Sequence, residues 1–201
     1  MPKAALSLSA IFLLLAVGWR SFVQYQRTRD FGFRRPPRDA RPLEKIAGAL
    51  LVLGVVGLLA SPGCTMVGFA PPLSLFNHAA VQVLGLLFAC FGIALTVWAE
   101  FEMGDSWRVG VDPSETTSLV EHGLFGRIRN PIYSGMLLFA LGLFCLAPSL
   151  LSLAAGLVFV FGIQLQVRGV EEPYLARRHG RTYCEYARTA GRFLPRVGRL
   201  P

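Results

Sequence analysis

Charged residues are scarce in this chain of 201 residues, since only 16% are Asp, Glu, Lys or Arg. Hydrophobic residues make up 53% of the sequence, and the mean hydropathy is +0.50. A soluble domain of this size normally carries more charge and less apolar surface. The composition therefore excludes a soluble globular domain and predicts a small integral membrane protein.

Cysteine is also infrequent, and it shows no redox or metal-binding spacing. The four cysteines, at positions 64, 90, 145 and 184, include no CxxC pair, so we predict no disulfide and no metal site. The three histidines show no metal-ligand spacing either. A dinucleotide-binding fingerprint is missing as well, because Gly54 and Gly57 lie inside an apolar run. This excludes a soluble Rossmann-type enzyme.

Apolar runs dominate what remains, and a helix needs about 20 such residues to cross the hydrocarbon core. Five runs are candidates: 4–19 (extended past Arg20 by Phe22 and Val23), 46–60, 76–99, 132–147 and 150–167. We expect Arg20 to snorkel toward water and Ser61-Pro62-Gly63 to end the second run. The sequence predicts an all-α, single membrane domain with five transmembrane helices and a C-terminal cytosolic helical segment. Residues 1–75 hold two spans and an Arg-rich loop, and 76–201 hold three spans and the tail.

The positions of the arginines predict the orientation. Seven lie between the first and second runs, three between the third and fourth, and eight after the fifth. The loop 62–75 has no charged residue. Because cations are retained in the cytoplasm, we expect the N-terminus outside and the C-terminus in the cytoplasm, in the cell inner membrane. A cleaved signal peptide following Lys3 stays open as an alternative.

The net charge of +8 does not indicate nucleic acid, because the basic residues lie beside apolar runs rather than on a separate polar domain. Anionic lipid headgroups are the partners that this pattern favours. All twelve acidic residues also lie on the predicted cytoplasmic side. We therefore expect the polar chemistry in the two inner segments 100–131 and 168–195, which the short fourth and fifth spans bring together.

The first inner segment ends at Asn130-Pro131, which is a good helix start because Asn caps free amides and Pro fits the first turn. The positive end of that helix, beside Arg127 and Arg129, also suits an anionic group. Tyr133 lies three residues from Asn130, on the same helical face. A helix start and the mouth of a ligand pocket are both consistent with this pattern.

The second inner segment begins where the fifth run ends. Arg168 and Glu172 are spaced i, i+4, which predicts a surface ion pair. Glu171 and Glu172 are adjacent and point about 100° apart on an α-helix, so they are not a close catalytic pair, although both can line one cavity. Tyr183 and Tyr186 are expected to seat the tail at the headgroup level.

Taken together, these segments resemble the isoprenylcysteine carboxyl methyltransferase family, which is related to the phospholipid N-methyltransferases. The likeness covers about 104–195, and no single motif carries it. The motifs, in order, are Leu119-Val120, Gly123-Leu124-Phe125, Arg129 to Gly135, Glu171-Glu172, Gly180 to Tyr183 and Gly191 to Pro195.

The resemblance implies an integral membrane enzyme that uses S-adenosylmethionine. The cofactor-binding positions that it implies are Ser118, Leu119, Val120, Phe125, Asn130, Pro131, Ile132, Tyr133 and Glu171. Arg168 is implied to face the substrate. Glu172 belongs to the glutamate pair that the resemblance implies contacts the cofactor, and it is predicted to be a catalytic residue together with Arg168. Three positions depart from the family pattern: Asn130 replaces the usual His, Phe125 replaces a common Tyr, and Arg168 stands one residue closer to the glutamates.

Methyl transfer from a sulfonium needs mainly the alignment of donor and acceptor. The resemblance therefore favours a methyltransferase at the cytoplasmic membrane face, acting on a lipophilic or small acceptor, with a prenylcysteine-like carboxylate preferred. Without the His, a protonated amine acceptor would need another base. The alternatives are a phospholipid N-methyltransferase, a thiol S-methyltransferase, an NADPH-dependent sterol-type reductase and a non-catalytic membrane scaffold.

Overall fold

The computed structural model describes residues 1–33, 41–108 and 119–200, and every regular element in them is helical, as predicted. The chain begins with one continuous helical rod, which we call the first rod and which consists of α1 (Pro2–Phe12), η1 (Leu13–Trp19) and α2 (Arg20–Thr28). It is followed by α3 (Pro42–Met66), η2 (Ser74–Phe76), α4 (Ala79–Met103) and η3 (Gly104–Ser106). The chain ends with α5 (Pro131–Leu146), α6 (Leu150–Leu165), η4 (Gln166–Glu171), α7 (Glu172–His179) and α8 (Arg181–Thr189).

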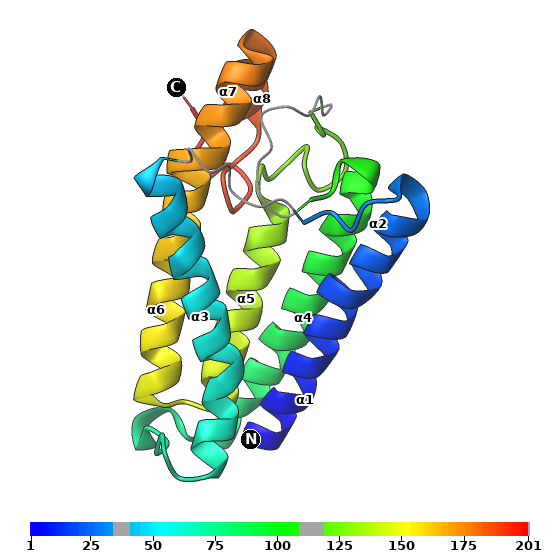
Figure 1. Ribbon diagram of the computed structural model, residues 1–201. Helices are drawn as coiled ribbons and strands as arrows, with labels where there is room; N and C mark the ends of the chain where they lie inside the picture. Colours follow the sequence, from blue (N-terminus) through cyan, green and yellow to red (C-terminus); the bar gives the residue numbers. More distant parts are fainter. Residues whose placement is uncertain (34–40, 109–118, 201) are drawn as a thin grey trace.

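Four helical rods are long and apolar enough to cross a membrane: 2–28, 42–66, 79–106 and 150–179. The protein is therefore an integral membrane protein. The fifth apolar helix, α5, has only 16 residues, about 24 Å at 1.5 Å per residue, and lies inside the bundle (Figure 1). The termini lie at opposite ends of the bundle (Figure 1).

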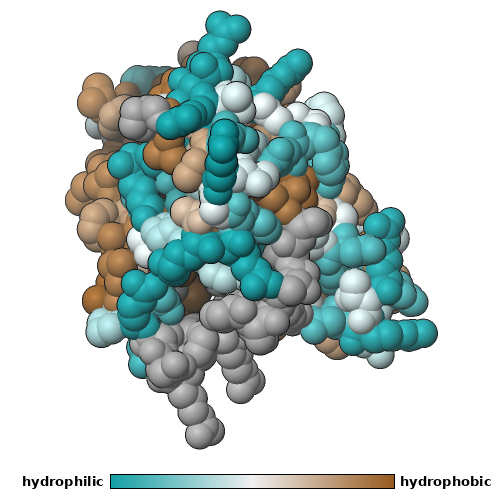
Figure 2. All heavy atoms as spheres, turned by 90° about the horizontal axis from the view of Figure 1, so that it is seen from above, coloured by the Kyte–Doolittle hydropathy of each residue, from teal (hydrophilic) through white to brown (hydrophobic). Residues whose placement is uncertain are grey.

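The two ends of the bundle differ in charge. At the lower end of Figure 1, the Met1 amine donates to Leu146 O at 2.7 Å and Pro72 pairs with Ser149, so the N-terminus, the uncharged loop and the α5–α6 turn lie together. We call this the hairpin end. The opposite end carries α7 and α8, and seen from above its surface is rich in hydrophilic side chains (Figure 2). We call it the charged end.

The α5–α6 turn is tight, with only residues 147–149 between the two helices. Ser149 caps α6 reciprocally with Ser152: the Ser152 amide donates to Ser149 Oγ at 3.1 Å, and the Ser149 amide to Ser152 Oγ at 2.9 Å. Such a capping box satisfies two amides that would otherwise lack partners. The connection therefore fixes α5 and α6 as antiparallel neighbours.

Two expectations about helix ends and charge are wrong. Pro62 does not end α3, which continues to Met66. Proline has no N–H and therefore cannot donate to the Leu58 carbonyl four residues earlier. Ser61 Oγ donates to that carbonyl instead, at 2.9 Å. Arg20 does not snorkel to water. It is 1% exposed, and its guanidinium donates to the carbonyls of Glu100 and Gly104.

Small residues let the helices pack closely in two pairs, α4 with α5 and α3 with α6. A Cβ at Gly92 of α4 would lie 2.5 Å from the Phe139 backbone of α5, and one at Gly54 of α3 would lie 2.6 Å from the Phe159 backbone of α6. Small residues are common at such contacts in membranes because they let backbones approach. The first rod packs across these pairs, contacting α3, α4 and α5.

Candidate active site

The two predicted inner segments meet at the charged end through backbone hydrogen bonds. The Arg129 amide donates to Gly191 O at 2.7 Å, the Gly191 amide donates to Arg127 O at 3.0 Å, and Ile128 pairs with Gly191 in a parallel bridge. Ser134 Oγ of α5 donates to Phe193 O at 2.6 Å. The expectation that the short helices bring these segments together is confirmed.

Asn130 starts α5 in a way that differs from the prediction. It occupies the N-cap position and Pro131 follows in the first turn, but the Asn130 side chain makes no capping hydrogen bond. Its amide Nδ2 donates to Arg192 O at 3.1 Å instead. The side chain therefore ties the C-terminal segment to the start of α5, while Asn130 still lines the cavity described below.

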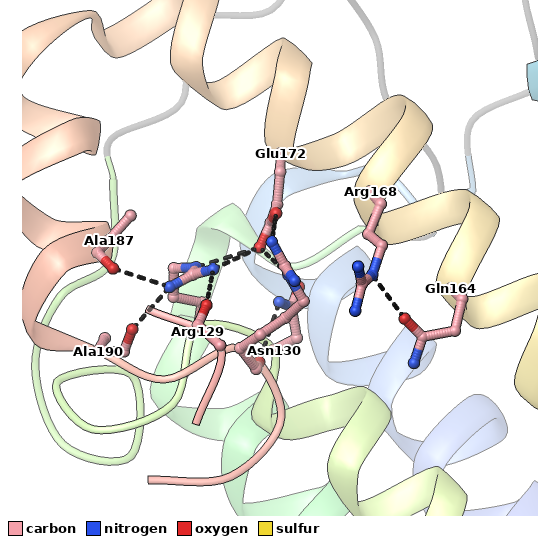
Figure 3. Close-up of polar contacts among 9 residues, drawn as sticks. Arg129, Asn130, Gln164, Arg168, Glu172, Ala187 and Ala190 are labelled. Carbon is pink, nitrogen blue, oxygen red and sulfur yellow. Dashed lines mark hydrogen bonds and ion pairs between the residues drawn. The ribbon is translucent and has the colours of Figure 1, made fainter. Parts of the chain in front are cut away.

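Arg129 lies at the centre of a buried ion network (Figure 3). Its Nε and Nη2 donate to Glu172 Oε1 at 3.1 and 2.8 Å, and its remaining N–H groups reach the carbonyls of Ala187, Ala190 and Gly198 at 2.6 to 3.0 Å. The side chain is 2% exposed. With its donors engaged by the protein, Arg129 fastens the C-terminal segment rather than offering a site for an external anion.

Glu172 completes this network. It accepts from Arg192 Nε on Oε1 at 2.9 Å and from Arg192 Nη2 on Oε2 at 2.8 Å, a bidentate pair. The carboxylate raises the pKa of Arg192, which stays charged. Glu172 therefore bridges two arginines that lie far from it in sequence.

The expected ion pair between Arg168 and Glu172 does not form, and Arg168 Nε donates to Gln164 Oε1 at 2.8 Å (Figure 3). Residues Gln166–Glu171 form a π-helix, in which side chains four apart no longer share a face as they do in an α-helix. Arg168 is exposed and, like Glu172, is not among the residues that line the cavity.

Glu171 points the other way, toward α5. Its Oε1 accepts from Tyr133 Oη at 2.7 Å and from Gln166 Nε2 at 3.1 Å. The two adjacent glutamates thus diverge as predicted, one into the arginine network and one toward Tyr133. This contact joins the first inner segment to the second at the cavity.

A cavity of about 470 Å³ lies between the helix pairs at the charged end. Ligand sites in proteins usually measure roughly 300–1,000 Å³. Every predicted cofactor residue that the structure describes lines it: Leu119, Val120, Phe125, Asn130, Pro131, Ile132, Tyr133 and Glu171. Ser118 lies outside the described residues.

The sequence did not point to the first two rods as part of the site, yet they line much of this cavity. The residues concerned are Phe12, Leu13, Ala16 and Val17 of the first rod and Leu51, Val52, Val55 and Val56 of α3. Several of these, including Leu13 and Val52, are also exposed on the bundle surface. Their apolar side chains carry no pattern that separates a cavity wall from a lipid-facing helix.

The two tail tyrosines are also placed differently from the expectation, because both are buried and line the cavity. Tyr186 Oη donates to Phe125 O at 2.7 Å. Tyr183 is 2% exposed, and its hydroxyl has no partner among the described residues. Burial raises the pKa of Tyr183 to about 12, so the phenol keeps its proton at neutral pH and can donate to a ligand.

The fold and the cavity together define a membrane-embedded protein. This cavity is lined by polar groups such as Tyr133, Glu171 and Tyr183 and by the apolar walls of the helices. Residues 80–182 match the family model described as phospholipid methyltransferase. The chain belongs to this family, which includes the isoprenylcysteine carboxyl methyltransferases. A comparison with curated proteins found no match. The protein is thus a membrane methyltransferase in its general class.

Tyr183→Phe is expected to weaken binding of S-adenosylhomocysteine about 2- to 10-fold, which is the value of one neutral hydrogen bond. The change removes only a hydroxyl that has no partner in the described residues. Titration of the purified protein in detergent measures the affinity. Tyr186→Phe is the comparison variant, because its hydroxyl bonds Phe125 O and its loss should lower the melting temperature instead. Unchanged affinity in Tyr183→Phe would remove this residue from the site.

Proposed function

We propose that the protein transfers a methyl group from S-adenosylmethionine to an acceptor with an apolar part, at the cytoplasmic face of the membrane. The observation that carries the proposal is the cavity in which Tyr133 bonds Glu171 and which the Leu119–Val120 and Asn130–Tyr133 segments line together. These segments are remote in sequence and meet only in the folded chain.

The residues of the cavity fit this cofactor. Glu171 offers a carboxylate for amino or hydroxyl groups, Tyr183 offers a buried donor, and Leu119, Val120 and Ile132 offer apolar surface for a flat ring. The cofactor supplies a methyl group on a positively charged sulfur. The protein's part is then to hold donor and acceptor in line and to exclude water.

The apolar wall supports an acceptor that enters from the bilayer. Leu13, Val17, Val52 and Val56 line the cavity and are also 38 to 65% exposed on the helix surfaces. A chain lying between the first rod and α3 would therefore pass from lipid to the cavity without crossing water. Leucine and valine walls suit a prenyl chain, acyl chains or a small apolar thiol equally.

The topology that we propose has five crossings, with the N-terminus outside and the charged end in the cytoplasm of the cell inner membrane. The uncharged loop at the hairpin end and the arginines of α7 and α8 support it. Arg168 is exposed on the same end, where it suits contact with an anionic headgroup at the membrane surface. Glu172 is held by Arg129 and Arg192. It would act by fastening the C-terminal segment to the start of α5, which keeps the cavity closed at this end.

Four alternatives differ in what they require. Phospholipid N-methylation and thiol S-methylation use the same cofactor and differ only in the acceptor. A sterol-type reductase would require NADPH, and the match to the methyltransferase family model disfavours it. A scaffold without catalysis would bind the cofactor and transfer nothing.

The test is the transfer of labelled methyl from S-adenosylmethionine into membrane lipid and small-metabolite extracts. We expect label in an extractable product that depends on the protein and on Glu171. A single labelled lipid or thiol would identify the acceptor. Cofactor binding without any labelled product would support the scaffold alternative, and neither binding nor transfer would contradict the proposal.

A further inference from the structure

Two polar residues of α4, outside the motifs that define the family likeness, lie at the cavity with an unsatisfied side-chain oxygen. Of these, Glu100 is the ionisable one, and Thr96 Oγ1 packs toward Gly135 of α5. Thr96 is 0% exposed and Glu100 is 5% exposed, and both line the cavity. Thr96 Oγ1 and Glu100 Oε2 have no hydrogen-bond partner among the described residues. A buried carboxylate oxygen without a partner is costly, and an ionisable side chain at membrane depth indicates function.

The register of α4 against α5 places Glu100 beside the start of α5. A Cβ at Gly142 would meet Ala89, one at Gly92 would meet Phe139, and one at Gly135 would meet Thr96. The helices are antiparallel, so the next turn of α4 toward the charged end sets Glu100 opposite Pro131. Glu100 therefore lies beside the Asn130–Tyr133 segment, and both line the cavity.

The protein holds the Glu100 backbone and leaves one buried carboxylate oxygen without a partner among the described residues. Arg20 Nε donates to the Glu100 carbonyl at 3.2 Å rather than to the carboxylate, and its guanidinium lies 4.7 Å from the Trp107 ring centroid. Trp107 interacts with the Glu100 side chain, but Oε2 remains unsatisfied. Within the described residues, no cation forms a salt bridge with Glu100.

We propose that Glu100 binds the reacting head of the acceptor and selects an amine over a carboxylate. The inference rests on the proposed function and names the acceptor chemistry of the same cavity. An ammonium or amine supplies the donor that Glu100 Oε2 lacks. A carboxylate acceptor would place two like charges together in a site of low dielectric. Phe12, Ala16 and Met103 also line the cavity and suit the apolar portion of such an acceptor.

Glu100 also supplies the base that Asn130, unlike a histidine, does not provide. The bound ammonium gives one proton to the Glu100 carboxylate, which frees the nitrogen lone pair. The nitrogen then forms the new N–C bond as the S–C bond of the donor breaks, with that electron pair going to sulfur. The product is an N-methylammonium, and Glu100 later releases its proton to water, so charge and atoms balance.

Glu100→Gln tests the inference because it keeps the shape of the side chain and removes the charge. Dodecylamine and phosphatidylethanolamine serve as amine probes, N-acetyl-S-farnesylcysteine as the carboxylate probe and dodecanethiol as the thiol probe. Binding of S-adenosylhomocysteine is measured in parallel to show that each variant is folded. Asp105→Asn is the matched control, because Asp105 lies near the end of the same helix with a side chain that is 68% exposed.

We expect the wild type to methylate an amine probe, and Glu100→Gln to lower that kcat at least about 100-fold while keeping cofactor affinity within about 2-fold. The residual rate of Glu100→Gln should rise about tenfold per pH unit toward alkaline pH, because only the free amine reacts. The other charged or titratable groups that line the cavity are Arg108, Arg129, Tyr133, Glu171, Tyr183 and Tyr186, and Arg20 contacts the Glu100 backbone. The variants leave all of these residues unchanged.

Three results would overturn the inference. A wild type that methylates the carboxylate or thiol probe but neither amine would contradict the amine selection. A Glu100→Gln variant that binds cofactor and methylates amines at the wild-type rate would remove Glu100 from the reaction. A wild type that does not bind S-adenosylhomocysteine at all would refute the proposed function itself, which the binding measurement separates from the other two results.

Discussion

Arg129→Met is expected to lower the free energy of unfolding by about 3–5 kcal/mol, the usual effect of removing one partner from a buried ion pair. The Arg129 side chain is 2% exposed and joins Glu172 to the carbonyls of Ala187, Ala190 and Gly198. Its loss leaves these carbonyls without their donor. The C-terminal segment should then detach from the start of α5, and the cavity should lose Tyr183 and Tyr186, the α8 residues that line it.

The melting temperature in detergent, followed with limited proteolysis of the C-terminal segment, measures this effect. A loss of 3–5 kcal/mol corresponds to about 10 °C for a chain of this size. Arg181→Met is the matched control, because Arg181 pairs with Glu185 at 2.7 Å while 92% exposed, and such pairs contribute less than about 1 kcal/mol. Equal shifts in the two variants would show that the buried network does not hold the segment.

Glu171→Gln should weaken binding of S-adenosylhomocysteine about 10- to 100-fold, because a hydrogen bond to a charged group is worth about 1.5–3 kcal/mol. Tyr133→Phe should have a smaller effect of about 2- to 10-fold. It leaves the carboxylate in place and removes only the hydroxyl that donates to Glu171 Oε1 at 2.7 Å. The order of the two effects separates direct contact with the cofactor from positioning of Glu171.

Isothermal titration with the protein in lipid nanodiscs provides these affinities. Glu185→Gln, which changes an exposed carboxylate to an amide on the same end of the bundle, should bind as tightly as the wild type. If Glu171→Gln also matched the wild type, the cofactor would not contact the carboxylate, and the assignment of this residue would be wrong.

The part of the site that sequence reasoning predicted well is the part carried by contiguous motifs. Asn130 to Tyr133 begin α5 and Glu171 ends the π-helix η4. The three-residue connection between α5 and α6 leaves these segments at one end. Their meeting therefore followed from span length and loop length. The family match over 80–182 agrees with the motifs that suggested it.

The features that were missed depend on contacts between residues remote in sequence. Glu172 was expected to pair with Arg168, but the π-helix changes which side chains share a face, and Arg129 and Arg192 hold Glu172 instead. The third span was predicted to end at 99, which left Glu100 in a loop. The structure carries α4 on to Met103 and buries Glu100.

The tail tyrosines and the first two rods were missed for a related reason. Tyr183 and Tyr186 show the spacing of an interfacial anchor, and only their packing with Leu119, Leu175 and Ala176 reveals that they are buried. Apolar residues such as Val52 and Val55 look alike whether they face lipid or a cavity. Only their position across from α5 gives them a part in the site.

Hydrogen exchange with and without S-adenosylhomocysteine tests the central claim most directly, because that claim is that two segments remote in sequence enclose one cofactor. Addition of the ligand should slow amide exchange in 119–135 and in 171–187, with the same dependence on ligand concentration in both segments. Exchange in the loop 67–78 at the hairpin end should not change. Protection of only one of the two segments, or of neither at saturating ligand, would contradict it.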